Sequence, residues 1–170
     1  TTLPHAITRT RKLLIIMTSL FLFCFSYYLV AVIVVAIGYH RCLSHKSLSL
    51  KPWFFKTLIT LGLPAGTPIQ WVGNHRFHHM HTDDELDPHS PVVNGFWFAH
   101  CGWYINSKNP FVCFLYAVAG PIRMIIDAIY RPISNQEYNH LAQDIESDNY
   151  FKWLSKPFIF RFFFFSRLLC

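Results

Sequence analysis

Histidine is concentrated in one part of this 170-residue chain. Eight of its ten histidines lie between His40 and His100. Six of those eight fall into two short clusters, HRCLSH at 40–45 and HRFHHMH at 75–81. Neutral imidazole is a good ligand for iron, zinc, copper and nickel. The two clusters therefore indicate a transition-metal site.

The spacing within each cluster determines which rings can meet. On a helix, His75, His78 and His79 stand at i, i+3 and i+4 and share one face, so we predict that they converge. His40 and His45 are five residues apart, about 140° around an ideal helix, and can share a site only if the helix ends or tightens between them. Five histidines exceed an ordinary zinc site. They indicate two metals, or one metal with supporting residues.

The remaining histidines have weaker positional arguments. His81, His89 and His100 could orient the ligands through hydrogen bonds, but an ordinary surface or core role fits them equally well. His5 and His140 stand alone, and we expect them to be structural. The five cysteines contain no CxxC pair, which indicates buried thiols in a reducing compartment and no disulfide framework.

The composition excludes an ordinary soluble globule. The chain is 52% hydrophobic and 14% charged, whereas a soluble domain typically has about 25% charged residues. Its many apolar and aromatic residues also exclude disorder. The net charge is +6, and no acidic residue precedes Asp83. The basic residues flank apolar segments, which favours an anionic membrane surface. We expect no nucleic-acid partner, because that would need a clustered basic face.

Two uncharged segments predict how the chain is placed in a membrane. Residues 13–39 carry no charge, and about 20 apolar residues suffice to span a bilayer, so we predict a transmembrane helix there. The run is too long for the apolar region of a signal peptide. Residues 57–74 are broken by glycine and proline, and we expect them to dip into the membrane or lie along it. That path keeps both histidine clusters on one side. Residues 138–153 are polar with helical spacing and predict a surface helix.

Four ordered motifs carry a resemblance to a known family. They are GYHRCLSH (38–45), WVGNHRFHHMHTD (71–83), DPHSP (87–91) and GFWFAHCGW (95–103), with a weaker DIESDNYFKWL at 144–154. Together they resemble the membrane fatty acid desaturases, most closely the Δ9-type branch that acts on acyl-CoA or acyl lipids. The resemblance implies an all-α, membrane-embedded fold. One full transmembrane helix and interfacial or re-entrant helices would carry the histidine cluster on the cytoplasmic side.

The resemblance also implies an activity. Two iron ions, dioxygen and two electrons from a cytochrome b5 or ferredoxin donor would introduce a cis double bond into a fatty acyl chain. The implied iron ligands are His40, His45, His75, His78 and His79. Trp71 would line the acyl tunnel, and Asp83 and Asp87 would have supporting roles. The protein would be integral to the endoplasmic reticulum membrane in a eukaryote, or to the inner membrane in a bacterium.

The chain also departs from the family pattern. We find no third HxxHH box, so we expect a fragment truncated before it, with no turnover from these residues alone. The domains would be a basic flank (1–12), a transmembrane helix (13–39), a partial desaturase domain (40–156) and an apolar tail (157–170) that begins a truncated span. Acyl-CoA-acting members often carry arginine where this chain has Gly73, which leaves CoA-, lipid- and carrier-linked substrates open.

Two alternatives compete with the desaturase. The first is a lipid hydroxylase of the same histidine-box superfamily, although the DPHSP and GFWFAHCGW motifs favour a desaturase. The second is a non-catalytic membrane fragment that binds zinc or no metal.

Overall fold

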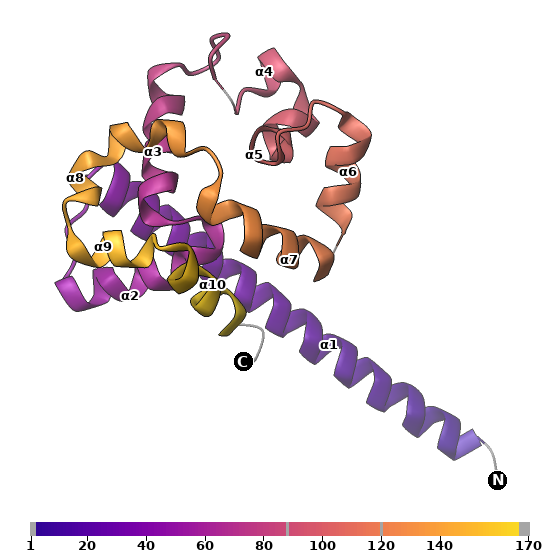
Figure 1. The fold of residues 1–170 in the computed structure, drawn as a ribbon. Coiled ribbons are helices and arrows are strands. Elements are labelled where there is room, and N and C mark those ends of the chain that lie inside the picture. The colour runs from indigo at the N-terminus through magenta and orange to yellow at the C-terminus, as the bar shows by residue number, and fades with distance from the viewer. Residues whose placement is uncertain (1–2, 88, 120, 167–170) are drawn as a thin grey trace.

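The computed structural model is built from helices joined by short loops (Figure 1). It describes residues 3–87, 89–119 and 121–166, and these residues form helices and no strand. The all-α fold class predicted from the sequence is therefore confirmed.

One long helix projects from the rest of the molecule (Figure 1). Helix α1 (Leu3–Ile33) continues without a break into the π-helix η1 (Val34–Ser44). The stretch Thr10–Ser44 is long and apolar enough to cross a membrane, and its most apolar part is only 7% buried within the structure. Side chains such as Met17 and Phe21 are more than half exposed. The predicted transmembrane segment lies within this helix.

The core lies where η1 meets the next helices. Helices α2 (Pro52–Gly62), η2 (Leu63–Ala65) and α3 (Pro68–Met80) fold back against η1. Tyr39 is fully buried here, and a Cβ atom on Gly62 would lie 2.4 Å from its ring. The helices therefore pack at close range.

The segment expected to dip into the membrane is largely this core. Residues 62–63 and 66–70 are buried in protein contacts, and Pro64 and Gly66 lie where the chain turns from α2 to α3. The turn returns the chain to η1, so the two histidine clusters meet at one end of the core. Helix α2 keeps an exposed apolar face with Trp53 and Phe54.

The middle of the chain forms short helices. They are α4 (Pro91–Asn94), η3 (Phe98–Gly102), α5 (Trp103–Ile105), α6 (Pro110–Val118), α7 (Pro121–Tyr130) and η4 (Arg131–Ile133). Side-chain caps begin two of them: Ser90 Oγ accepts from Val93 N–H, and Asn109 Oδ1 accepts from Phe111 N–H. Cys101 of η3 forms a small second core with Cys113 and Tyr116 of α6.

The C-terminal region covers α3 and α2. It contains η5 (Gln136–Ala142), α8 (Gln143–Glu146), α9 (Asn149–Leu154) and α10 (Pro157–Ser166). The single surface helix predicted over 138–153 is wrong, because a 3₁₀ helix and two short α-helices replace it. Asp148 caps the last of these by accepting from Tyr150 N–H at 2.7 Å, which starts a new helix inside the predicted one. Within the predicted apolar tail, residues 167–170 lie outside the described part.

Candidate metal centre

Four histidines from the two sequence clusters meet at one point. His40 and His45 come from the end of η1, and His75 and His79 come from α3. Their ligand nitrogens all lie within 4.8 Å of one another. The Nε2 atoms of His45 and His79 lie 3.0 and 3.1 Å from His75 Nε2. We name these four residues the four-histidine cluster.

A π-helix brings His40 and His45 onto the same side. The N–H of His45 donates to the carbonyl of His40 at 3.0 Å, five residues back, and the two ring centroids are 4.5 Å apart. The helix ends at Ser44, between the two histidines, as the sequence argument allowed, and its last turn is widened into a π-helix. π-Helical turns are rare and often mark functional sites. No feature of the sequence identifies this one.

The four-histidine cluster has the chemistry of a transition-metal site. Burial, followed by the neighbouring histidines, lowers the pKa of His75 to about 3, and burial also lowers the pKa of His79. Both rings are therefore neutral near pH 7 and keep a lone pair for a metal. The single Nε2 of His75 faces two other Nε2 atoms, and one proton or one lone pair cannot serve both. A divalent metal bound by nitrogen ligands would satisfy all three.

His78 lies on the same helix but points to a different partner. Its Nδ1–H donates to the Asp87 carboxylate, with distances of 2.9 and 3.0 Å to Oδ1 and Oδ2. Asp87 is fully buried and also accepts from the N–H groups of Asp83 and His89. Burial alone would raise the pKa of Asp87, but these hydrogen bonds lower it below its usual value. The arrangement leaves His78 Nε2 free to bind a metal.

His89 completes a second group of possible ligands. Ligand atoms of His78, Asp87 and His89 lie within 4.8 Å of one another, and we name these residues the His78 group. The His89 ring lies 4.0 Å from the Trp103 ring, and burial lowers its pKa to about 4. The structure therefore separates His78 from the other four predicted iron ligands.

Three predicted supporting residues lie outside both groups. His81 Nδ1 is 2.8 Å from Asp84 Oδ2. Asp83 accepts from Ser90 Oγ at 2.7 Å. His100 is exposed, and its ring is parallel to that of Phe96. None of the three contacts the four-histidine cluster through a described hydrogen bond.

An ion-pair cluster that the sequence analysis missed joins the two histidine segments. Arg76 of α3 donates to both oxygens of Asp144 at 2.6 and 3.0 Å, and to the Ser44 carbonyl at 3.2 Å. Lys46 Nζ lies 2.6 Å from Asp144. The hydrogen bond from Arg76 lowers the pKa of Asp144 most, and the contact with Lys46 lowers it further. Together they hold this pKa far below its usual range. Asp144 belongs to the DIESD motif, whose spacing from Arg76 gave no signal of pairing.

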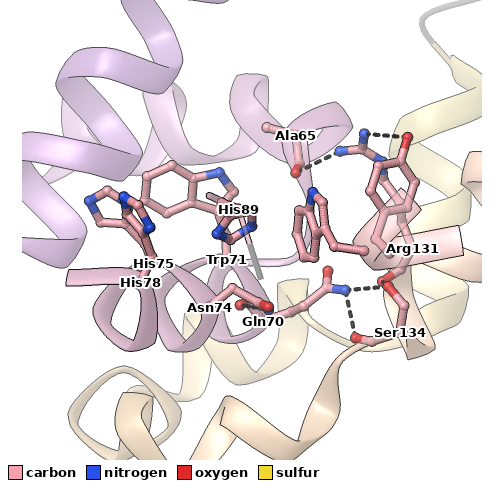
Figure 2. Close-up of a pocket in the computed structure, with 11 residues that line it drawn as sticks. Ala65, Gln70, Trp71, Asn74, His75, His78, His89, Arg131 and Ser134 are labelled. Atoms are coloured by element: carbon pink, nitrogen blue, oxygen red, sulfur yellow. Dashed lines mark hydrogen bonds between the residues drawn. The ribbon is translucent and has the colours of Figure 1, made fainter. Parts of the chain in front are cut away.

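A pocket of about 320 Å³ lies beside the metal ligands (Figure 2). Trp71 lines it and stacks on His75 with 4.7 Å between ring centroids. His75 and His78 lie at one end of the pocket and Arg131 and Ser134 lie at the other, with His89 between them (Figure 2). The predicted substrate-binding residue Trp71 therefore lines the pocket in direct contact with one of the histidine rings.

Gly73 of α3 packs against the backbone of η5. A Cβ atom there would approach the Tyr138 carbonyl oxygen to 2.4 Å. The position has no room for an arginine side chain unless η5 moves.

Comparison with curated proteins shows several desaturases among the relatives of this chain. The sn-2 palmitoyl-lipid 9-desaturase of Nostoc is 32% identical over 145 residues, which is 84% of this chain and 43% of the relative. The sn-1 stearoyl-lipid 9-desaturase of Anabaena variabilis is 32% identical over 128 residues, 74% of this chain and 38% of the relative. The acyl-CoA C20 Delta5-desaturase of Anemone leveillei is 42% identical over 88 residues, 50% of this chain and 28% of the relative.

The other comparisons add no further match. No protein-family model matches the chain, and no solved structure matches it. The chain spans less than half the length of each of the three relatives. The curated relatives are acyl-lipid and acyl-CoA desaturases, and together they identify this chain as a member of the fatty acid desaturase family.

Proposed function

We propose that this chain supplies part of a di-iron centre that introduces a cis double bond into a fatty acyl chain. The observation that carries the proposal is the four-histidine cluster, built from nitrogen ligands alone, next to a pocket lined by Trp71. When bound, the two irons supply the oxidising chemistry, with dioxygen and two electrons from a cytochrome b5 or ferredoxin donor. Two hydrogens would leave adjacent methylene groups of the substrate.

The histidines divide between the two irons in this proposal. His40, His45, His75 and His79 would hold one iron. His78 would present Nε2 to the other iron while Asp87 fixes its ring through Nδ1–H. Further ligands, from a third histidine box, would complete the second site. We therefore propose that the five histidines alone do not support turnover.

The pocket beside Trp71 would hold the acyl chain near the irons. Its volume of about 320 Å³ lies at the lower end of the range for ligand pockets, roughly 300–1,000 Å³. The aromatic rings of Trp71 and Trp103 would exclude water from the reacting methylenes. Hydrogen bonds fix the shape of the pocket away from the histidines. Gln70 donates to the carbonyl and hydroxyl oxygens of Ser134, and Arg131 donates to the Ala65 carbonyl.

We propose an acyl chain carried by a membrane lipid as the substrate. The two relatives that match 74% and 84% of this chain are lipid desaturases by name. Acyl-CoA-acting members often carry arginine at the position of Gly73. The packing of Gly73 against Tyr138 leaves no room for that side chain, which favours a lipid-linked substrate over an acyl-CoA. The membrane would be the endoplasmic reticulum in a eukaryote or the inner membrane in a bacterium.

Lipid analysis of cells that express this sequence within a gene that also encodes a third histidine box tests the activity. A new cis double bond that disappears in the His75→Ala variant supports the proposal. A new hydroxyl group would assign the chain to the related hydroxylases. Stoichiometric zinc without iron in the purified protein, together with unchanged lipids, would favour the non-catalytic alternative.

A further inference from the structure

Two helices away from the metal centre expose an apolar surface. Large side chains on α6 and α7 are between 45% and 65% exposed: Phe111, Leu115, Val118, Ile122, Ile125 and Ile129. These two helices, 110–118 and 121–130, are named the α6–α7 hairpin. A large exposed apolar patch on a protein marks a contact with another protein or with a membrane.

The one acidic side chain of the hairpin is buried and is paired with basic side chains. Asp127 is 8% exposed and accepts from the Tyr116 hydroxyl. Its carboxylate lies 3.6 Å from Arg123 Nε and 3.4 Å from Arg131 Nε. Arg131 also donates to the Ala65 carbonyl at 2.7 Å. Ionisable residues inside membranes are found paired in this way.

The charge around the hairpin suits a lipid surface. Asp127 is the only acidic residue in the sequence between positions 88 and 136, and that interval holds three basic residues. One of them, Lys108, is exposed just before α6 begins. A basic side chain at the border of an apolar helix favours anionic lipid headgroups. A second protein would need a complementary apolar face, and the described residues identify none.

The shape of the hairpin favours an excursion over a full crossing. Helices of 9 and 10 residues are about 13–15 Å long, roughly half of the ~30 Å hydrocarbon layer. The pair is apolar enough for a membrane and bent by 109°. Figure 1 shows the last turn of α6 and the first turn of α7 toward the side of the body from which α1 projects. An open apolar pocket of about 560 Å³ lies between the two helices and is lined in part by Val112, Leu115 and Ile126.

We propose that the α6–α7 hairpin is a re-entrant element that enters the bilayer beside α1 and returns to the same side. Its exposed side chains would contact lipid acyl chains, and Lys108 would lie among the headgroups. Tyr104 and Arg131 belong both to the hairpin network and to the wall of the Trp71 pocket. The hairpin would therefore hold that pocket at the edge of the hydrocarbon. This inference is independent of the metal centre and of the reaction.

Spin labels at single cysteines test the inference in the full chain. Cys24 and Cys170 are replaced by serine, and the buried Cys42, Cys101 and Cys113 are kept. Labels are then placed in separate variants at two exposed hairpin positions, Val118→Cys and Leu115→Cys. Phe21→Cys on α1 provides the lipid reference and Glu85→Cys provides the water reference. The protein is reconstituted in vesicles of phosphatidylcholine and phosphatidylglycerol at three to one.

The readout is collision of each label with oxygen, which enters lipid, and with a water-soluble nickel chelate. We expect an oxygen-to-nickel ratio at Val118 and Leu115 that is several-fold above that at Glu85 and close to that at Phe21. A ratio equal to that at Glu85 would place the hairpin in water and overturn the proposal. Exclusion of both reagents would mean that protein covers the surface, and this result would overturn it as well. Neither result depends on iron, so the proposed function is tested separately.

Discussion

One helix, α3, contributes to two groups of possible ligands that differ in chemistry. The four-histidine cluster contains nitrogen ligands from two helices and no carboxylate. The His78 group lies within a span of twelve residues, and a buried carboxylate fixes the orientation of its first histidine. Neighbouring positions 78 and 79 therefore have different roles.

In the proposed di-iron centre, one short motif would serve two metal positions. The cluster depends on long-range packing, because η1 must lie against α3 before its four rings can meet. The His78 group depends on a local turn, because Asp83, Asp87 and His89 follow α3 closely along the chain. Changes that loosen the contact between η1 and α3 should therefore damage the cluster and leave the His78 group intact.

The largest expected effect is on metal affinity. It is measured in two variants, each of which removes one imidazole ring from one of the two groups. His75→Ala takes away the nitrogen that faces both His45 and His79, so we expect metal affinity to fall more than the roughly 100-fold upper limit for supporting residues. His78→Ala should leave affinity at the four-histidine cluster within about threefold, because that ring is not one of its ligands. Anaerobic titration with Fe²⁺ or Zn²⁺ measures both. Equal losses of metal affinity in the two variants would contradict the distinction between the four-histidine cluster and the His78 group.

Removing the buried carboxylate tests the His78 group. Asp87→Asn loses a charged acceptor of several hydrogen bonds in a fully buried position, so we expect about 3 kcal/mol lower unfolding free energy. His78 should lose its fixed Nδ1–H tautomer, which ¹⁵N NMR of the ring detects. Asp83→Asn, which affects a more exposed carboxylate, is the matched control and should cost about 1 kcal/mol or less. A wild-type tautomer in Asp87→Asn would contradict the assigned role.

The Arg76–Asp144 pair tests the packing between η1 and α3. Asp144→Asn weakens a bidentate pair that is about one third exposed, so solvent screening reduces the expected loss of stability to about 1–2 kcal/mol. Metal affinity of the four-histidine cluster should fall by less than about tenfold, the lower limit for supporting residues, and the His78 tautomer should stay unchanged. The exposed Glu146 on the same helix provides the control variant Glu146→Gln. An altered His78 tautomer in Asp144→Asn would show that the two groups are coupled.

The smallest expected effect is a pH dependence of the metal-free protein. The pKa of His75 falls from 6.5 to about 3 on folding, so the unfolded chain takes up the proton first as the pH falls. Stability from this group is complete above pH 6.5 and decreases steadily toward pH 3. Thermal unfolding between pH 7.5 and 4.5 measures the slope, and His75→Gln should reduce it. An unchanged slope in that variant would exclude His75 as the source.

The sequence could predict part of this arrangement. Spacing at i and i+4 was sufficient to place His75 and His79 together. His78 differs from His79 by about 100° around the helix, which allows the Asp87 carboxylate to hold it, and helical periodicity contains no information about that contact. The meeting of His40 with His45 depends on a π-helix, and ideal α-helical geometry predicted the opposite. The charged contact between Arg76 and Asp144 required the tertiary fold.

The long apolar helix followed from composition and hydropathy, which report burial and exposure over many residues at once, whereas the all-α fold class followed from the family resemblance. The Gly- and Pro-broken stretch at 57–74 was harder to place. An uncharged segment is equally compatible with lipid and with a protein core, and only the packing against η1 shows that much of it lies in the core.

X-ray absorption spectroscopy of the Fe²⁺-loaded chain tests the central claim most directly. The account predicts one iron with mainly nitrogen ligands and outer scattering from about four imidazoles, as the four-histidine cluster provides. This signal should be lost in His75→Ala and kept in His78→Ala. An iron bound mainly by oxygen, or an imidazole signal that survives in His75→Ala and is lost in His78→Ala, would contradict the account.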